Sequence, residues 1–407
     1  MLEKTIPVGK SLLLLIIILG CLNTLGPIGI DMFLAGVPNI AEGLNSSPNR
    51  VIASISTLML GNAVGQLALG PLSDRYGRKP IILLTVILFT GSALASGLSL
   101  SVEHFIFWRF IQGLAISAGR ILAASVARDL FERELLGKLM SEILVVTAIA
   151  AIIFPILGGQ VAQYFPWQWL FWTMVIFGSV VLLLVFFFFQ ETIKEINPQA
   201  IRPHYLLTNW IEALQNPVFL RYALCSSFTM AGFGAFLAIS TTVLRGAFGI
   251  SAEEYGFLFA LVAFFFLIST FTAGRLIMKI GQQRLIAIGV SVAFASATVM
   301  LVLAVLEIQE PLAVILPTSF FVFGIGWVFP QCNALALQPF PNSAGSAAAM
   351  MGFWSNITSA GMAFLLSTVA HTSAFYLALA IFVTSLLAAI VYFLIIRPAE
   401  ISEIQKS

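Results

Sequence analysis

The sequence predicts an all-α integral membrane protein with twelve transmembrane helices arranged as two six-helix pseudo-repeats. Three observations predict this fold: the composition, the number of long apolar segments, and a short motif that recurs half a chain apart. Of the 407 residues, 59% are hydrophobic and only 9% are charged. A soluble domain carries about 25% charged residues. We therefore expect the bilayer, rather than water, to surround most of this chain.

Twelve apolar segments are long enough to cross a bilayer core, which needs about 20 residues per helix. They are continuous and do not alternate with period two, which excludes an outer-membrane barrel. The first segment runs past a signal-peptide core without a clear cleavage site, so we expect it to be retained. The expected spans are 11–34, 50–71, 80–99, 103–127, 139–163, 167–189, 218–243, 254–278, 283–306, 311–335, 343–369 and 373–396.

Basic residues fall almost entirely on one side of these predicted spans. If the N-terminus is cytoplasmic, the outside holds only Arg50 and Arg245. Both termini are then expected in the cytoplasm by the positive-inside rule. The residues on the cytoplasmic side are Lys4, Lys10, Arg75, Arg78, Lys79, Arg128, Arg133, Lys138, Lys194, Arg202, Arg221, Arg275, Lys279, Arg284, Arg397 and Lys406.

The longest polar stretch, 190–217, divides the chain into two halves. It contains Pro198, Pro203 and Pro217, and it would lie in the cytoplasm between spans six and seven. We therefore expect an N-terminal six-helix bundle at 1–189, a cytoplasmic linker at 190–217 and a C-terminal six-helix bundle at 218–407.

A strongly charged turn, GPLSDRYGRKP (70–80), lies between predicted spans two and three and recurs in weaker form as GRLIMKIGQQR (274–284) between spans eight and nine. Gly77, matched by Gly281 in the second copy, permits a tight turn, and Pro80 suits the first turn of the next helix. Gly70 is expected to let two helices approach closely. The recurrence indicates a duplicated six-helix unit.

The two copies of the turn differ in their charges. Asp74 in the first copy is expected to pair with a neighbouring base or with a helix N-terminus, whereas Met278 stands at the equivalent position in the second copy. Asp129 and Glu132, which follow span four, are expected partners for the bases of the first turn. An ionic cluster is therefore expected in the first half alone. The alternative is that the basic residues only fix the topology of the loop.

Several segments resemble a known family of transporters. GPLSDRYGRKP resembles motif A of the major facilitator superfamily, RFIQG (109–113) resembles its motif B, and PILGG (155–159) resembles part of its antiporter motif C. IDMFLAGVP (30–38), residues 231–261 and QPFPNSAGSAAAMMGF (338–353) resemble more closely the Bcr/CflA family of bacterial drug/proton antiporters. The resemblance covers nearly the whole chain.

This resemblance implies the major facilitator fold, with a binding site near the midplane between the two halves. It also implies a conformational latch formed by Gly70, Asp74, Arg75, Gly77 and Arg78, and an antiporter-type motif at Pro155, Gly158 and Gly159. The chain departs from motif C where Phe154 precedes Pro155 and where Ser141 and Ala150 replace glycines. This departure leaves proton-coupled import open as an alternative to export.

Three ionisable side chains stand out deep inside the predicted spans, where each costs several kcal/mol unless it has a partner or a water-filled cavity. Asp31 and Arg109 lie about 12 and 9 Å outside the midplane by the helical rise, so they are expected partners. Proton affinity of such an acid depends on its neighbours, as proton coupling requires. With Gln112 and Arg120 they form the expected proton-coupling and substrate site.

Structural alternatives exist for each of these charged residues. Asp31 can instead cap the end of span one, and Arg109 can instead hydrogen-bond to backbone carbonyls. Arg120 can instead extend its side chain to the cytoplasmic surface.

Breaks are expected in two spans that would line the cavity. Gly26 and Pro27 interrupt span one, and Gly324, Gly326 and Pro330 are expected to do the same in span ten. For the glycines of span ten, close helix packing is an equally good explanation.

The sequence argues against an enzyme or an ATP-driven pump. GKS at 9–11 does not form a phosphate-binding loop, because Lys4 occupies the position of the first required glycine. The three histidines lack metal-ligand spacing, and the three cysteines lie in apolar runs. The histidines are His104, His204 and His371, and the cysteines are Cys21, Cys225 and Cys332.

The predicted function is therefore a proton-coupled secondary transporter, with export favoured. We expect a monomer in a bacterial inner membrane that binds protons and a small amphipathic or apolar organic substrate. We expect no cofactor other than the proton gradient, no metal site and no nucleic-acid partner.

Overall fold

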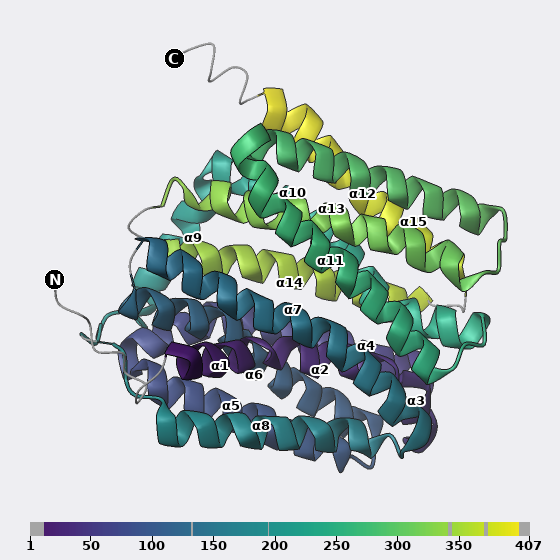
Figure 1. Cartoon of the computed structure of the whole chain (residues 1–407), viewed down its shortest axis with the longest axis horizontal. Helices are drawn as coiled ribbons and strands as arrows, with labels where there is room; N and C mark the ends of the chain where they lie inside the picture. The colour runs from purple at the N-terminus through teal and green to yellow at the C-terminus, as the bar shows by residue number, and fades with distance from the viewer. Residues whose placement is uncertain (1–11, 132, 194, 341–343, 370–372, 399–407) are drawn as a thin grey trace.

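The computed structural model describes residues 12–131, 133–193, 195–340, 344–369 and 373–398, which are almost entirely helical and contain no β-strand element (Figure 1). Four predicted cytoplasmic lysines, Lys4, Lys10, Lys194 and Lys406, lie outside the described residues, as does Glu132.

Helices of the first half are α1 (Leu12–Asn23), α2 (Leu25–Leu34), α3 (Val37–Gly43), α4 (Pro48–Tyr76), α5 (Arg78–Gly97), α6 (Val102–Leu130), α7 (Arg133–Tyr164) and α8 (Gln168–Phe188). The remaining helices are α9 (Pro203–Gln215), α10 (Pro217–Thr241), η1 (Thr242–Ala247), α11 (Ala252–Ile280), α12 (Gln282–Val305), α13 (Pro311–Leu337), α14 (Ala344–Val369), α15 (Ala374–Ile390) and η2 (Val391–Ile396). The two η segments continue α10 and α15 as short π-helices.

Twelve membrane crossings account for the long helices of the described residues, whereas the short helices α3 and α9 are not crossings. Within the described residues, ten helices are long and apolar enough to span a bilayer, and the bent pair α1–α2 forms another crossing. The 26-residue α14 completes the set, packed between α10 and α4. The twelve-span prediction is confirmed, although helices such as α4 and α7 extend several residues beyond the predicted spans at their ends.

The first span is broken and the tenth is not. The axes of α1 and α2 differ by 44°, and the break falls at Thr24, just before Gly26 and Pro27. In contrast, α13 continues through Pro330. Its glycines are packing positions: a Cβ at Gly324 would lie 2.6 Å from the Gly289 carbonyl oxygen of α12. The break predicted for span ten was therefore wrong, and the packing explanation holds.

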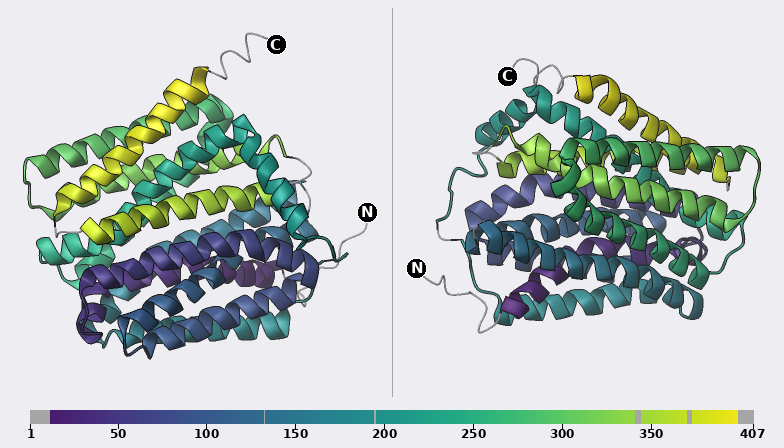
Figure 2. Two further views of the ribbon diagram at one scale, coloured as in Figure 1. Left: turned by 180° about the vertical axis from the view of Figure 1, so that it is seen from behind. Right: turned by 45° about the horizontal axis from the view of Figure 1, so that its top comes forward.

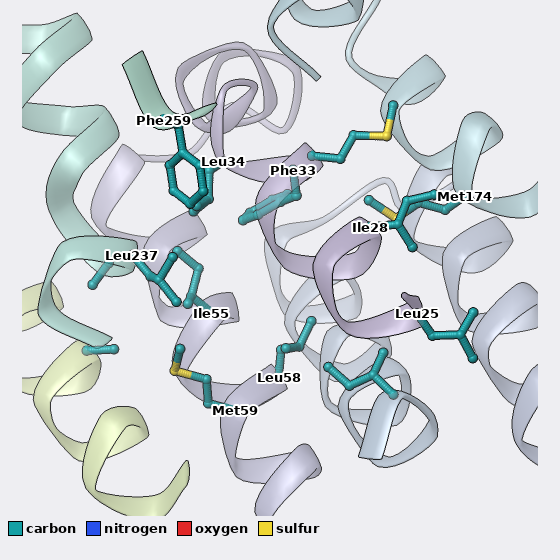
Figure 3. Close-up of a cluster of buried hydrophobic side chains, with 14 of the residues drawn as sticks. Leu25, Ile28, Phe33, Leu34, Ile55, Leu58, Met59, Met174, Leu237 and Phe259 are labelled. Carbon is teal, nitrogen blue, oxygen red and sulfur yellow. The ribbon is translucent and has the colours of Figure 1, made fainter. Parts of the chain in front are cut away.

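The two halves lie side by side and meet along two pairs of helices (Figures 1 and 2). Helix α4 packs against α14, and α7 packs against α11. A continuous apolar cluster crosses the boundary near α2, where Leu237 and Phe259 of the second half face Leu34 and Ile55 of the first (Figure 3). Side chains from both halves thus bury one shared surface.

The recurring turn has the same backbone in both halves. Gly77 ends α4 and precedes α5 with φ 100° and ψ 155°, and Gly281 ends α11 and precedes α12 with φ 80° and ψ 162°. These angles are essentially restricted to glycine. The predicted duplication is therefore visible in the backbone.

Gly70 does not have the packing role predicted for it. A Cβ there would meet only an Ile121 methyl group at 3.8 Å, an ordinary van der Waals distance. Helices α4 and α6 instead meet one to three turns earlier, where Gly61 and Gly65 face the backbone of Phe110 and Leu114. A larger residue is sterically tolerable at 70 because α4 has already diverged from α6.

The predicted linker contains a folded helix. The 13-residue α9 begins at Pro203, and Pro217 begins α10, so both prolines occupy first-turn positions that suit them. Helix α9 packs against α10 and α14 of the second half.

Candidate functional site

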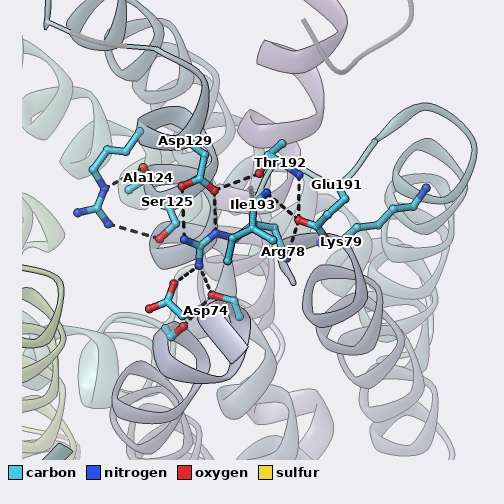
Figure 4. A network of polar contacts seen from close by, with 12 residues as sticks. Asp74, Arg78, Lys79, Ala124, Ser125, Asp129, Glu191, Thr192 and Ile193 are labelled. Carbon is cyan, nitrogen blue, oxygen red and sulfur yellow. Dashed lines mark hydrogen bonds and ion pairs between the residues drawn. The ribbon is translucent and has the colours of Figure 1, made fainter. Parts of the chain in front are cut away.

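Arg78 is the centre of an ionic cluster at the first turn. Its Nη1 donates to Asp74 Oδ1 at 2.5 Å, and its Nε donates to Asp129 Oδ2 at 2.9 Å (Figure 4). The Arg78 side chain is only 8% exposed, so it is buried between two carboxylates. Asp74 and Asp129 are confirmed as its partners. We call Asp74, Arg78, Asp129, Glu191 and Thr192 the Arg78 cluster.

The chain that follows α8 completes this cluster. Glu191 accepts hydrogen bonds from the backbone N–H groups of Arg78 and Lys79, both at 3.0 Å, and so caps the start of α5. Thr192 Oγ1 lies 3.1 Å from Asp129 Oδ2. Sequence reasoning missed Glu191; the signal was Gly77, which has no side chain with which to cap α5.

Arg75 and Gly70 lie outside the Arg78 cluster. The Arg75 guanidinium lies 5.8 Å from the Tyr76 ring centre, and no described residue pairs with its buried Nε. Of the five predicted latch positions, the structure thus brings together Asp74 and Arg78, with Gly77 shaping the turn between them.

Arg109 is fully buried inside the first half. Its guanidinium carbon lies 4.3 Å from the centre of the Phe33 ring and 5.9 Å from that of Phe171. It donates a hydrogen bond to the Gln112 side chain, while its Nε and Nη2 have no partner among the described residues. Gln112 Nε2 in turn contacts Met174 Sδ at 3.6 Å. The guanidinium of Arg109 is therefore held by two aromatic rings and one side-chain amide.

The predicted Asp31–Arg109 pair is wrong for this structure. Asp31 is half-buried on α2, and no described side chain or backbone group forms a hydrogen bond or ion pair with it. Phe33 lies two residues later, about 200° around the helix, and it is Phe33 that faces Arg109. Their depths match, but Asp31 points away from the interior of the first half.

Asp31 lies one turn before a set of polar contacts between the halves. Thr241 Oγ1 donates to the Leu34 carbonyl at 2.9 Å. Arg245 Nη1 donates to the Ala35 carbonyl and to Asn39 Oδ1. The last carbonyls of a helix lack intrahelical partners and attract a cation, which explains this arrangement at the end of α2.

The end of α7 and the start of α11 continue this set of contacts. Gln160 Nε2 donates to Glu253 Oε1 at 2.8 Å, and the Tyr164 hydroxyl donates to Glu253 Oε2 at 2.9 Å. We call the contacts of Thr241, Arg245 and Glu253 the outer seal, because they lie at the span ends that the sequence predicts to face outside. Sequence reasoning counted Arg245 only as an outside basic residue and missed the seal.

The PILGG segment forms a close backbone contact beside the outer seal. A Cβ at Gly159 would lie 2.6 Å from the Ala252 carbonyl oxygen, and a Cβ at Gly256 would lie 2.5 Å from the Pro155 carbonyl oxygen. Gly158 is equally close to the backbone of Met32. These glycines therefore let α7 touch both α2 and α11.

Arg120 lies on α6 with its side chain exposed, and its guanidinium carbon is 5.1 Å from the Phe329 ring centre of α13. It therefore reaches towards the second half rather than towards the cytoplasmic surface. Among the described residues, no group of three or more His, Cys, Asp or Glu side chains is arranged to hold a metal ion.

The family of this chain follows from comparison with known proteins. The model of the family described as Major Facilitator Superfamily matches residues 19–363. The chain belongs to the major facilitator superfamily. As a member of that superfamily it is a multi-pass membrane transporter and not an enzyme.

Similar superfamily members include resistance proteins. The chain is 32% identical over 344 residues to a bicyclomycin resistance protein homolog of Haemophilus influenzae, covering 84% of this chain and 86% of that protein. It is 27% identical to multidrug resistance protein MdtL of Klebsiella pneumoniae, covering 93% and 94% of the two chains. These relatives confirm the resemblance to the bicyclomycin-resistance type.

Solved structures confirm the major facilitator fold. The crystal structure of a D-xylose-proton symporter superimposes with a TM-score of 0.75 at 17% identity, covering 94% of this chain and 98% of the symporter.

Proposed function

We propose that this transporter exports small organic compounds in exchange for protons, by alternating access in a bacterial cytoplasmic membrane. The names of its relatives, which are bicyclomycin and multidrug resistance proteins, support export of drug-like molecules. We further propose that it acts as a monomer, with both termini and residues 190–217 in the cytoplasm, and with halves bounded at 189 and 218.

The observation that carries this proposal is the unpaired carboxylate of Asp31. A charged acid inside a membrane protein without a partner is costly, so it is typically functional. Asp31 is half-buried and one turn from the Leu34 and Ala35 carbonyls that hold the outer seal.

Proton binding at Asp31 would change the charge at the place where the halves meet. A protonated Asp31 is neutral and favours the closed seal, whereas an ionised Asp31 favours a hydrated, open boundary. A proton that binds Asp31 from outside would then close the outer seal, and its release to the inside would open the seal again. In this cycle Arg109 and Gln112 support α2 through Phe33, and the Arg78 cluster latches the cytoplasmic end of the first half.

Transport into inside-out membrane vesicles tests this function. With an acidic interior imposed, wild-type protein should accumulate bicyclomycin or another amphipathic drug from a panel, because vesicle entry corresponds to export. Asp31→Asn should abolish accumulation driven by the gradient, and Asp31→Glu should retain part of it. Glu42→Gln, which changes an exposed acid on α3, is the matched control and should transport normally.

Two results would contradict the proposal. Gradient-driven accumulation by Asp31→Asn would remove Asp31 from coupling. Accumulation by wild-type protein only in right-side-out vesicles, with the gradient inward, would show proton-coupled import instead.

A further inference from the structure

Arg120 is a cation without an acceptor among the described residues, positioned between the two halves. Its neighbour Gly119 packs directly on the backbone of Leu22 and Asn23, which places this part of α6 beside the bend of the first span. Ala118 and Leu122 are both 1% exposed, whereas Arg120 is exposed. Its nearest aromatic partner, Phe329, belongs to α13 of the opposite half. The exposed face of Arg120 is therefore the face that looks across the boundary between the halves.

No oxygen in the described part of the chain accepts a hydrogen bond from Arg120, and no described carboxylate pairs with it. The contact with Phe329 is a cation–π interaction, which leaves the five N–H donors of the guanidinium free. A charged group at this depth needs a compensating partner or water. The fork of donors matches the two oxygens of a carboxylate or phosphate.

Comparison with two other arginines, Arg109 inside the first half and Arg245 at the boundary, distinguishes Arg120. Arg109 also has free donors, but it is 0% exposed and enclosed by Phe33 and Phe171, so no substrate can reach it. Arg245 already donates to Ala35 and Asn39. Of these three cations, Arg120 combines free donors with an open approach.

We infer that Arg120 binds an oxyanion group of the transported compound, and that the preferred substrates are small aromatic carboxylates. The guanidinium takes the carboxylate through paired N–H donors, and the Phe329 ring, which now covers the cation, packs against the apolar body of the substrate. This inference rests on the proposed function, because it identifies the bound compound with the exported one.

Equilibrium dialysis of the purified full-length protein tests this assignment. The probes are benzoate, phenylacetate, 1-naphthoate and 4-phenylbenzoate, each compared with its primary amide, which has the same shape and no charge. Wild-type protein should bind at least one carboxylate about tenfold more tightly than its amide. Arg120→Gln should reduce this ratio to about one, since the amide side chain cannot pair with an anion.

Three further variants keep the test decisive. Arg128→Gln changes an arginine two turns along the same helix, where Ala124 and Ser125 accept its hydrogen bonds, and should leave the ratio unchanged. Phe329→Leu should also keep the preference for the carboxylate. Arg120→Lys keeps the charge but not the fork, so the ratio should fall several-fold without vanishing. This variant decides the matter if Arg120→Gln does not fold.

Two results would overturn the assignment. In the first, wild-type protein binds none of the carboxylates more tightly than its amide. In the second, Arg120→Gln keeps the wild-type ratio of carboxylate affinity to amide affinity. Dialysis uses no proton gradient, so its outcome is independent of coupling. Failure of the proposed exchange would appear separately, as the absence of gradient-driven accumulation by wild-type vesicles.

Discussion

The two copies of the glycine turn, at Gly77 and Gly281, share a backbone and differ in almost everything around it. At residue 77 the turn is enclosed by the Arg78 cluster, with side chains contributed by α4, α5, α6 and the chain after α8. At residue 281 an added Cβ would meet no atom of the described residues within 4 Å, and the nearby Met278 is 87% exposed. The glycine fixes the path of the chain in both halves, whereas the ionic cluster depends on residues that only the first half supplies.

This difference separates two functions of one motif. To reverse the direction of the chain, the turn needs only a glycine and a residue after it at which a new helix can begin. Both copies have these two features. A latch needs opposite charges that stay within bonding distance of each other. Only the first copy has them, because Arg78 lies between the carboxylates of Asp74 and Asp129. Stability should therefore respond to substitution much more strongly in the first copy than in the second.

Removing the central cation should have the largest effect. Arg78→Met leaves Asp74 and Asp129 facing each other without a cation, and we expect a loss of about 3 kcal/mol in the free energy of unfolding. Unfolding in mixed detergent micelles measures it. Lys79→Gln changes the adjacent, partly buried lysine, whose Nζ donates to the Phe186 carbonyl and not to a carboxylate, and should cost less than about 0.5 kcal/mol. Equal losses for the two variants would contradict a special role for Arg78.

Replacing the two turn glycines compares the copies directly. Both Gly77→Ala and Gly281→Ala force a side chain into a left-handed conformation, which costs about 1–3 kcal/mol. The Cβ at residue 77 would also lie 2.6 Å from Glu191 Oε2 and disturb the cap of α5. The loss at 77 should therefore exceed the loss at 281 by about 1 kcal/mol, measured in the same micelles. Indistinguishable losses would show that the cluster adds nothing to the turn.

Neutralising the cap should have a smaller effect. Glu191→Gln keeps an acceptor for the Arg78 and Lys79 N–H groups but loses the charge at the start of α5, so about 1 kcal/mol should be lost. Glu195→Gln, four residues later and exposed, serves as the control. The melting temperature of each purified variant checks this, and a larger shift for Glu195→Gln would refute the capping role.

Adding an acid to the second copy should have the smallest effect. Met278→Asp places a carboxylate where the first copy has Asp74, but Gln282 stands where the first copy has Arg78. With no arginine at the position equivalent to Arg78, we expect a change within about 0.5 kcal/mol and unaltered vesicle transport. A clear stabilisation would mean that the second copy can form a latch without an arginine.

The fold could be predicted because its main signal is local. Each span is a run of about 20 apolar residues, and the turn glycines repeat at a fixed offset. The helix ends were underestimated because helices such as α4 and α7 continue through charged residues, where hydropathy no longer marks the boundary. The cytoplasmic location of the termini and the division at 189 and 218 stay predictions.

The site was predicted less completely, for two physical reasons. Helical rise gave the depths of Asp31 and Arg109, but it did not give the rotation of α2 about its axis, which turns Phe33 rather than Asp31 towards Arg109. The outer seal uses the backbone carbonyls of Leu34 and Ala35 as acceptors, and backbone groups have no sequence signature. Partners contributed by side chains, such as Asp129 for Arg78, could be predicted from charge alone.

The glycine contact between α7 and α11 has a consequence for the speed of the transport cycle. Where Pro155, Gly159 and Gly256 meet, backbone touches backbone, so parting and rejoining the two helices there immobilises no side-chain rotamers. Helices α7 and α11 can therefore separate and come together again without reordering side chains at this contact. The polar bonds of Thr241, Arg245 and Glu253 add to the apolar burial that holds the two halves together beside this contact, so single substitutions at these three positions should change the rate of opening.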